Sequence, residues 1–375
     1  MPIKVAHVVR QYYPSIGGME DVVQNIAHYQ ARCHGHIPTI ITLNRVFVNP
    51  ADILPAEEVV NGVRVIRIPY SGSTRYPFSP GVVRLLGDYD VVHVHGVDFA
   101  YDYLAATKWL HRRPLVASTH GGFFHTSFAS RLKTIFFHTV TRATSHAYAR
   151  VVGTSDNDGN LFGKIIKAPR LTVIENGVNV EKYHAKGSTT KLPCIMYFGR
   201  WSSNKGLKET LDLFAGLAAR HPEWRLVIAG REYDLSRADL EALAREKGIA
   251  ERVSIVANPS DAQLAELMSQ SSYYICLSRH EGFGIAAIEA MSAGLTPVLS
   301  DIPPFRKLLE KAQLGILHTG DVAQTVAAIA AAHAQDQDAY AARRLQLQHF
   351  SEQYSWNHIG GRYVEIYEEL LRKRK

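Results

Sequence analysis

Residues 273–290 read Tyr-Tyr-Ile-Cys-Leu-Ser-Arg-His-Glu-Gly-Phe-Gly-Ile-Ala-Ala-Ile-Glu-Ala, and this stretch indicates the class of fold. An apolar run of strand length ends at Ser278, a loop with two glycines follows, and a helix of small residues is predicted to begin near Phe283. Backbone N–H groups at such a helix start can bind a phosphate or a sugar oxygen. The stretch therefore predicts one strand, one ligand-binding loop and one helix of an α/β sheet.

The same alternation runs along the whole chain. Apolar, β-branched runs separated by room for a helix occur at 3–9, 39–43, 63–68, 91–95, 115–118, 151–153 and 171–174, and again at 194–198, 225–229, 253–256, 273–277 and 296–299. This pattern predicts parallel sheets with helices on both faces. Because 375 residues exceed one comfortable core, we expect two doubly wound, Rossmann-like domains.

A polar stretch at 185–191 separates the two series. We place an N-terminal domain at 1–180 and a C-terminal domain at 181–355, and expect residues 356–375 to form a helix that crosses back to the first domain. Ligands bind outside the carboxyl ends of parallel strands. Glycines and polar residues follow these ends in both halves, so we expect the ligand to bind between the domains.

The composition is that of a globular protein, with 46% hydrophobic and 21% charged residues. The three cysteines, Cys33, Cys194 and Cys276, form no Cys-x-x-Cys pair, which suits a reducing compartment. No signal peptide precedes the first strand, and no apolar run approaches the ~18 residues of a membrane span. We therefore expect a cytoplasmic protein.

The positive charge lies mostly in the first half of the chain. The net charge is +7, and residues 1–180 contain 18 Lys and Arg against 12 Asp and Glu. A basic half can meet nucleic acid, anionic lipid or a phosphorylated substrate, or can serve solubility alone.

Two carboxylates mark the loop and helix at 279–290. Glu281 precedes the helix and Glu289 follows eight residues later, about 12 Å along a helix axis. Glycosidase carboxylates lie roughly 5–9.5 Å apart, so this pair suits opposite ends of one long ligand, a sugar and a ribose joined by a diphosphate. In the alternative interpretation Glu289 is a solvated helix residue, and Gly282 and Gly284 are ordinary turn residues.

Two cations follow the first strand of the second series, in the stretch Phe-Gly-Arg-Trp-Ser-Ser-Asn-Lys-Gly at 198–206. Arg200 offers a bidentate fork and Lys205 a point charge, and both can neutralise a departing diphosphate. A helix is expected from about Leu207. The alternative is a pair of solvated loop cations.

Gly17 and Gly18 follow the first strand of the chain. Adjacent glycines allow the backbone to approach a ligand closely before a helix begins. The stretch is not Gly-x-Gly-x-x-Gly, so it does not support a nicotinamide dinucleotide site.

Other chemistries are not supported. His93 and His95 lack a third ligand at a recognisable spacing and are interpreted as core or cleft histidines. The three Asp-x-Asp strings, at 88–90, 156–158 and 336–338, are more simply caps or turns than magnesium sites. No Walker loop or Gly-x-Ser-x-Gly elbow is present. We expect no metal and no cofactor.

The combined motifs resemble a known family, the retaining glycosyltransferases of family four, which have the GT-B fold. The resemblance rests on Glu281-x7-Glu289, on Gly199-Arg200 with Lys205-Gly206, on Gly17-Gly18, and on Glu-Asn-Gly-Val-Asn at 175–179. Three further stretches, at 7–20, 91–96 and 118–126, are similar to the α-1,3-mannosyltransferases that extend cellobiosyl-diphosphopolyprenol in acetan- and xanthan-type exopolysaccharide assembly. The family usually has Pro and Asp where this chain has Glu175 and Asn179, neither of which is expected to touch the chemistry.

The resemblance implies GDP-mannose as the donor, bound by the C-terminal domain, and a polyprenyl-diphosphate-linked disaccharide as the acceptor, bound by the N-terminal domain. Arg200 and Lys205 would clamp the diphosphate, Glu289 would bind the ribose and Glu281 the transferred sugar. The Gly17 and Gly18 amides would face the phosphate and the sugar, and His120 would stand beside the reacting sugar. The remaining donor contacts are expected from Asn258, Gly282, Phe283, Gly284 and Ile285.

Other functions on the same fold stay open at this point. The donor could be another nucleotide sugar such as a UDP-sugar, or the chain could be a nucleotide-sugar epimerase or a phosphorylase. It could also be a non-catalytic nucleotide-sugar sensor, which would need no acceptor groove.

A basic helix is predicted at 129–150. At 100° per residue Arg131, His138, Arg142 and His146 share one side, and the other side carries Leu132, Phe136, Phe137, Val140, Ala143 and Ala147. The residues expected to contact the acceptor or the membrane are Arg131, Lys133 and Arg142. Such a helix can lie on anionic lipid, or it can pack its apolar side on the sheet. We expect peripheral attachment to the inner face of the cell membrane through this segment, and no nucleic-acid partner.

Overall fold

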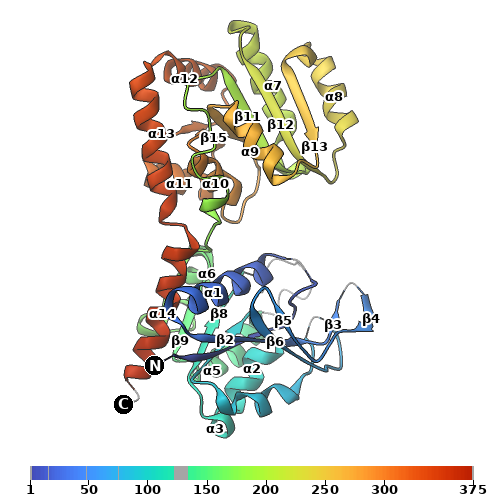
Figure 1. Cartoon of the computed structure of the whole chain (residues 1–375), viewed down its shortest axis with the longest axis vertical. Helices are drawn as coiled ribbons and strands as arrows, with labels where there is room; N and C mark the ends of the chain where they lie inside the picture. The colour runs from blue at the N-terminus through green and yellow to red at the C-terminus, as the bar shows by residue number, and fades with distance from the viewer. Residues whose placement is uncertain (1, 16, 48, 75, 122–133, 374–375) are drawn as a thin grey trace. The chain divides into compact units, whose positions relative to one another are not determined.

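The computed structural model describes residues 2–373 apart from residues 16, 48, 75 and 122–133. The chain divides into two compact units (Figure 1). The first comprises Met1–Gly177 with Trp356–Lys375, and the second comprises Val178–Ser355. The division therefore falls three residues before the expected one.

The described residues of the first unit form an eight-stranded sheet in the order β10-β9-β8-β7-β1-β2-β6-β5. Its strands are β1 (Lys4–Val9), β2 (Ile37–Leu43), β5 (Glu57–Val60), β6 (Val63–Ile68), β7 (Val91–His95), β8 (Leu115–Ser118), β9 (Arg150–Gly153) and β10 (Leu171–Val173). All neighbouring strands pair in parallel except β5 with β6. The short edge strand β5 and the hairpin of β3 (Arg45–Val46) with β4 (Asn49–Ile53) were not predicted, because neither has a long apolar run.

Both faces of this sheet are covered. Successive strand residues point to opposite faces, so Val5 joins one buried cluster while Ala6 joins another. The Val5 cluster contains residues of α1 (Gly18–His34) and α14 (Trp356–Arg372), and the Ala6 cluster contains residues of α2 (Phe99–Ala106). Helix α14 thus belongs to the core of the first unit, although it ends the chain.

Helices α14 and α1 lie in close contact at a glycine. A Cβ atom on Gly360 would lie 2.4 Å from Cγ of Tyr29, so the Tyr29 ring occupies the space of the missing side chain. Other helical segments of this unit are η1 (Pro80–Asp88), α3 (Lys108–His111), η2 (Phe137–Thr141), α5 (Arg142–Ser145) and α6 (Asp156–Phe162).

The second unit contains a six-stranded parallel sheet in the order β13-β12-β11-β14-β15-β16. Its strands are β11 (Cys194–Trp201), β12 (Arg225–Glu232), β13 (Val253–Ala257), β14 (Tyr273–Cys276), β15 (Thr296–Ser300) and β16 (Ile316–His318). Its helices are α7 (Leu207–Arg220), α8 (Arg237–Glu246), α9 (Asp261–Ser269), α10 (Ile285–Ala293), α11 (Pro303–Ala312), α12 (Val322–Ala334) and α13 (Gln337–Glu352). β16, an edge strand of three residues, was not predicted, and β11 runs three residues further than predicted.

Each sheet has one point where the strand order reverses. In the first unit the chain proceeds outward from β1 to β2 on one side and from β7 to β8 on the other. In the second it proceeds from β11 to β12 and from β14 to β15. A crevice opens at the carboxyl ends of the two strands that flank such a point, and ligands bind there. The predicted α/β class with two doubly wound sheets is confirmed.

The predicted helix at 129–150 is only partly correct. Residues 134–136 are helical, η2 is a π-helix, and α5 ends at Ser145. The helix stops because Tyr148 is buried with its ring stacked on Tyr101, and because the Ala149 amide bonds to the Leu115 carbonyl at the sheet. A π-helix has more residues per turn than an α-helix, so sides counted at 100° per residue do not hold across this segment.

The Asp-x-Asp strings have local roles. Asp336 caps α13 and accepts a hydrogen bond from the Ala339 amide at 2.7 Å, and Asp90 accepts one from the Lys4 amide at 2.8 Å. Asp158 accepts hydrogen bonds from Thr119 and Thr154. Among the described residues, every helix is too short or too polar to cross a bilayer.

Candidate functional site

The reversal point of the second sheet carries an ion pair. Lys205 Nζ bonds to Glu281 Oε1, which joins the segment after β11 to the segment after β14. Both side chains are mostly buried, with 20% and 16% of their surface exposed. Two of the predicted site residues, 76 positions apart in the chain, are therefore in direct contact at the place where the sheet opens.

Hydrogen bonds hold the two segments together around this pair. The Asn204 side chain donates to the His280 carbonyl at 2.8 Å, and the Arg279 amide donates to the Asn204 carbonyl at 2.9 Å. Ser278 Oγ lies 3.4 Å from Glu281 Oε1 as a second donor to that carboxylate. The two segments that carry the ion pair are thus joined to each other by hydrogen bonds, which fix the positions of Lys205 and Glu281.

Gly206 permits this close approach. Its φ is 66°, and a Cβ atom there would lie 2.0 Å from the Leu277 carbonyl oxygen. A contact with backbone at that distance cannot be relieved by a side-chain rotation, so only glycine fits. Without it, Lys205 could not be held beside the end of β14.

Arg200 lies one residue before the end of β11 and is exposed. Its guanidinium stacks over the Tyr233 ring, 4.6 Å from the ring centroid. This contact orients the planar group and leaves its N–H edges available to an anion. Arg200 and Lys205 thus both lie at the carboxyl edge of this sheet.

Asn258 lies at the same edge, after β13. Its φ is 50°, and its backbone N–H donates a hydrogen bond to the Gly230 carbonyl at 2.7 Å. In the sheet, β12 separates β13 from β11, the strand that precedes Lys205. Asn258 is therefore on the predicted edge, away from the reversal point.

The glycines of the 279–290 stretch differ from each other. Gly284 has φ 86° at the start of α10, and a Cβ atom there would lie 2.8 Å from the Phe305 ring. Both the backbone conformation and the lack of space favour glycine at this position. Gly282 is exposed, and a Cβ atom there would meet nothing within 4 Å. Phe283 packs edge-on against Tyr354, while Ile285 is 49% exposed. The loop therefore presents Gly282 and Ile285 outward at the N-terminus of α10.

Glu289 is not a solvated helix residue. It is partly buried in α10, and burial raises its pKa to about 7, against a smaller opposite effect of Lys182. Lys182 itself bonds to Asp261 Oδ1 at 2.8 Å, and the Asp261 charge raises the Glu289 pKa further. Glu289 is a carboxylate kept partly away from water, which suits hydrogen bonding to ligand hydroxyls. Sequence reasoning missed Lys182 and Asp261, because η4 (Val180–Tyr183) and α9 meet α10 only through the fold.

The first unit places Gly17 and Gly18 at the start of α1. Gly17 is the N-terminal cap, and a Cβ atom there would lie 2.6 Å from the Glu20 carboxylate. Glu20 accepts a hydrogen bond from Ser15 Oγ at 3.1 Å. Backbone amides at this helix start follow the end of β1, one of the two strands at the reversal point.

His120 follows β8 and has φ 50°, an uncommon backbone conformation for a residue other than glycine. Its Nε2 atom lies 3.0 Å from Nδ1 of His95, the last residue of β7. Burial lowers the pKa of His120 to about 4. The ring is therefore a neutral hydrogen-bonding group at physiological pH.

A third histidine, His7 on β1, lies with His93 and His95 in one fully buried group whose nitrogen atoms approach within 4.8 Å. Sequence spacing could not reveal it, because the strands meet only through the parallel register that pairs His7 with His93. Every ring nitrogen of the three already has a hydrogen-bond partner at 3.0 Å or less. The prediction of core histidines is correct.

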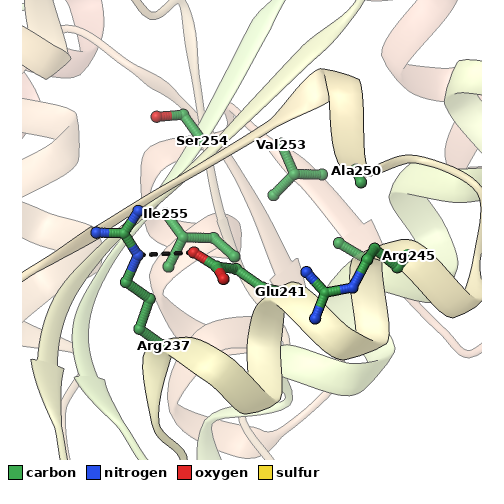
Figure 2. Close-up of a pocket in the computed structure, with 8 residues that line it drawn as sticks. Arg237, Glu241, Arg245, Ala250, Val253, Ser254 and Ile255 are labelled. Carbon is green, nitrogen blue, oxygen red and sulfur yellow. Dashed lines mark hydrogen bonds and ion pairs between the residues drawn. The ribbon is translucent and has the colours of Figure 1, made fainter.

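A hollow of about 430 Å³ lies elsewhere in the second unit, between α8 and β13 (Figure 2). Arg237 and Glu241 form an ion pair at its rim, and none of the predicted site residues lines it. β13 is the edge strand of its sheet, so this hollow is away from the reversal point.

Of the predicted membrane-contacting residues, Arg131 and Lys133 lie outside the described residues. Arg142 begins α5 and is exposed, as are His138 and His146. On the side predicted to be apolar, Phe137 is buried but Val140 is 38% exposed, and neighbouring Ile135 is 61% exposed.

Known proteins match nearly the whole length of the chain. The family model "Glycosyltransferase Family 4" matches residues 16–182, and "Glycosyl transferases group 1" matches residues 179–344. The GDP-mannose:cellobiosyl-diphosphopolyprenol alpha-mannosyltransferase of Xanthomonas campestris is 50% identical over 370 residues, covering 98% of this chain and 97% of that protein. The enzyme of the same description from Komagataeibacter xylinus is 41% identical, covering 98% and 94%.

Solved structures agree on the fold. A glycosyltransferase from Rickettsia africae superposes with a TM-score of 0.72 at 19% identity, covering 99% of both chains. Such a likeness shows the architecture, and the identity to the mannosyltransferases shows the relationship. The chain belongs to the family of the GDP-mannose:cellobiosyl-diphosphopolyprenol alpha-mannosyltransferases, glycosyltransferases of the GT-B fold class.

Proposed function

We propose that this chain transfers mannose from GDP-mannose to cellobiosyl-diphosphopolyprenol, with retention of the anomeric configuration, as a step of exopolysaccharide assembly. The observation that carries the proposal is the Lys205–Glu281 pair at the reversal point of the second sheet, in a chain 50% identical to a mannosyltransferase of that description. A cation and a carboxylate side by side suit the junction between a diphosphate and a sugar ring.

The donor is assigned along the carboxyl edge of the second sheet. Arg200 and Lys205 neutralise the diphosphate, which leaves Glu281 for the hydroxyls of the mannose. The N-terminus of α10, with Gly282–Ile285, supplies backbone N–H groups to the phosphates. Glu289 binds the ribose, and Asn258 completes the edge on the side of β13.

The chemistry needs little from the protein beyond charge and position. The bond from the mannose anomeric carbon to the β-phosphate oxygen breaks, and a bond to an acceptor hydroxyl oxygen forms. The hydroxyl proton passes to the departing phosphate, so no strong protein base is required. Fixed cations and helix N-termini that stabilise the developing phosphate charge do the work that a metal ion does elsewhere. We therefore propose that no metal is needed.

The first prediction concerns donor, acceptor and metal together. Purified protein is incubated with a short-chain cellobiosyl-diphospholipid and a panel of GDP- and UDP-sugars, with saturating EDTA or with Mg²⁺. We expect an α-linked mannosyl product from GDP-mannose, formed at the same rate with EDTA as with Mg²⁺. Transfer from a UDP-sugar instead would change the donor assignment, isomerisation of donor without acceptor would indicate an epimerase, and loss of activity in EDTA restored by Mg²⁺ would refute metal independence.

The second prediction concerns the cations. Arg200→Ala or Lys205→Ala leaves the departing diphosphate without its counter-charge, so kcat should fall by about 100-fold or more, as when an oxyanion-stabilising donor is lost. Lys208→Ala is the matched control, because Lys208 is an exposed cation three residues beyond Lys205. Wild-type rates in either site variant, or an equal loss in the control, would contradict the assignment.

The third prediction concerns Glu289. Ribose hydroxyls donate hydrogen bonds to a carboxylate, and burial raises the Glu289 pKa to about 7, so the binding form is complete only above that pH. The donor Kd should increase as pH falls from 8 to 6, and Glu289→Gln should bind more weakly with no such pH dependence. Donor titrations by calorimetry measure this. Lys182 and Asp261 face the same carboxyl group, so a Kd whose pH dependence survives in Glu289→Gln would assign the titration to another group.

Membrane attachment is proposed through residues 134–146. A polyprenyl acceptor stays in the bilayer, so the enzyme must come to its surface. Exposed Ile135 and Val140 offer apolar contact, and exposed Arg142 and His138 lie within a few residues of them. Each cation near anionic lipid contributes about 1 kcal/mol. We propose a location at the inner face of the cell membrane, without a nucleic-acid partner.

The fourth prediction tests this attachment by co-sedimentation with vesicles. Binding should require anionic lipid, weaken with added salt, and decrease strongly in an Arg131→Glu/Arg142→Glu variant. A Lys208→Glu/Arg220→Glu variant makes the same change in net charge on exposed residues of α7 and should bind like wild type. Equal losses in both variants, or binding that does not depend on salt, would contradict attachment through this segment.

A further inference from the structure

A continuous line of hydrogen bonds connects His120 to the inside of the first unit. His120 Nε2 meets His95 Nδ1 at 3.0 Å, and His95 Nε2 meets His7 Nδ1 at 3.0 Å. His7 Nε2 meets the side-chain oxygen of Gln30, again at 3.0 Å. Three histidines and one glutamine from β1, β7, α1 and the end of β8 thus form one relay.

The fold places this relay at the reversal point of the first sheet. β1 and β7 are the two strands that flank it, and their register sets His7 opposite His93 and Val9 opposite His95. Gln30 reaches the relay from α1, the helix that begins at Gly18. His7, His95 and Gln30 have at most 1% of their surface exposed, so water does not supply alternative partners.

The amide oxygen of Gln30 sets the direction of every bond. A carbonyl oxygen can only accept, so His7 must carry its proton on Nε2. A neutral imidazole has one donor and one acceptor nitrogen. His7 Nδ1 therefore accepts from His95 Nε2, and His95 Nδ1 accepts from His120 Nε2.

A second branch of hydrogen bonds runs beside the relay. The Tyr367 hydroxyl of α14 lies 2.7 Å from His93 Nδ1, and His93 Nε2 in turn meets Ser118 Oγ at 2.8 Å. The amide nitrogen of Gln30 is buried and has no hydrogen-bond partner among the described residues. The bond to His7 is made by the amide oxygen, which is the atom that the direction of the relay depends on.

The relay is uncharged. Burial lowers the pKa of His7 to about 4 and that of His95 well below its ordinary value, and the neighbouring histidines lower the His95 pKa further. His93 of β7 packs against His95, with ring centroids 4.0 Å apart, and burial lowers the pKa of His93 well below its ordinary value. Ser118 of β8, and Tyr363 and Tyr367 of α14, contact His93 and are neutral at physiological pH. The histidines therefore stay neutral down to about pH 4, and one proton pattern is maintained.

We propose that His95, His7 and Gln30 are positioning residues, which hold His120 in the tautomer with its proton on Nε2 and present the Nδ1 lone pair to a hydroxyl of the substrate. No described residue makes a hydrogen bond to His120 Nδ1. The left-handed backbone of His120, with φ 50°, is a conformation that persists only where the surroundings over-determine it. The contact between His120 Nδ1 and a substrate hydroxyl rests on the proposed mannosyl transfer. The tautomer of His120 does not depend on that function.

The tautomer is read directly by ¹⁵N NMR of ligand-free protein with labelled histidine rings, with signals assigned from single His→Gln variants. We expect His7, His95 and His120 all to be protonated at Nε2 alone between pH 8 and pH 5. A His120 ring protonated on Nδ1, or one that titrates near pH 6.5, would overturn the proposal. Because this measurement needs no activity, it separates failure of the relay from failure of the proposed function.

The fifth prediction concerns Gln30, the end of the relay. Gln30→Met has a similar size but no acceptor, so the tautomer of His120 should become mixed and kcat should fall by about 10-fold, the low end of the effect of outer hydrogen-bond partners on functional histidines. The donor KM should change by less than about two-fold, since such a variant loses an interaction made in the transition state. Gln348→Met is the matched control, because Gln348 is a buried glutamine of α13 in the other unit.

Gln30→Glu separates positioning from packing. Its carboxylate accepts the same hydrogen bond from His7, so the tautomer should be retained. The added negative charge favours protonated histidine, so the acid limb of the kcat profile should move to higher pH than in wild type. A merely structural role would leave the pH profile unmoved. Full activity and an unchanged His120 tautomer in Gln30→Met, with the stability loss seen in Gln348→Met, would refute the relay.

Discussion

The reversal of strand order in each parallel sheet is the constraint on which the sites depend. Where β11 and β14 lie side by side, the chain leaves their carboxyl ends in opposite directions, toward β12 and toward β15. Ligands bind at such points in parallel sheets, and side chains from distant parts of the sequence meet there. Lys205 and Glu281 meet in this way in the second unit, and His95 and His7 in the first.

The side chains at the two reversal points differ in charge. In the second unit a mostly buried cation and carboxylate are paired, and each compensates the desolvation of the other. In the first unit burial removes charge altogether, since the histidines are held neutral and exchange hydrogen bonds in a fixed direction. A charged site suits a diphosphate, and a neutral site suits the hydroxyls of a sugar.

Glycine gives these sites their close fit. At Gly206 and Gly230 a Cβ atom would lie 2.0 Å and 1.7 Å from a backbone carbonyl oxygen. At Gly284 the obstacle is the Phe305 ring of α11, which fills the space below the start of α10. The second unit thus brings loops against strand ends more closely than any side chain would allow, and this closeness keeps the ion pair and the helix N-terminus in place.

Local sequence patterns were enough to predict the α/β class, nearly every long strand and the loops that carry the candidate site residues, because apolar periodicity and glycine-rich strand ends are local properties of the chain. The bounds of β6, β7 and β8 agree with the predicted ones residue for residue. The motif at 279–290 likewise indicated Glu281 and Glu289 before any contact was known. The edge strands β5 and β16 were not predicted.

Which distant residues meet depends on the packing of separate elements. His7 and His95 are 88 positions apart, and their contact follows from strand order and register, neither of which is encoded in local pattern. The end of α5 at Ser145 likewise depends on Tyr148, whose ring stacks on Tyr101 of α2. The pKa of Glu289 depends on its burial and on the charges of Lys182 in η4 and Asp261 in α9. Composition and spacing supply the chemical groups, but the packing of separate elements sets the charge, the tautomer and the partner of each group.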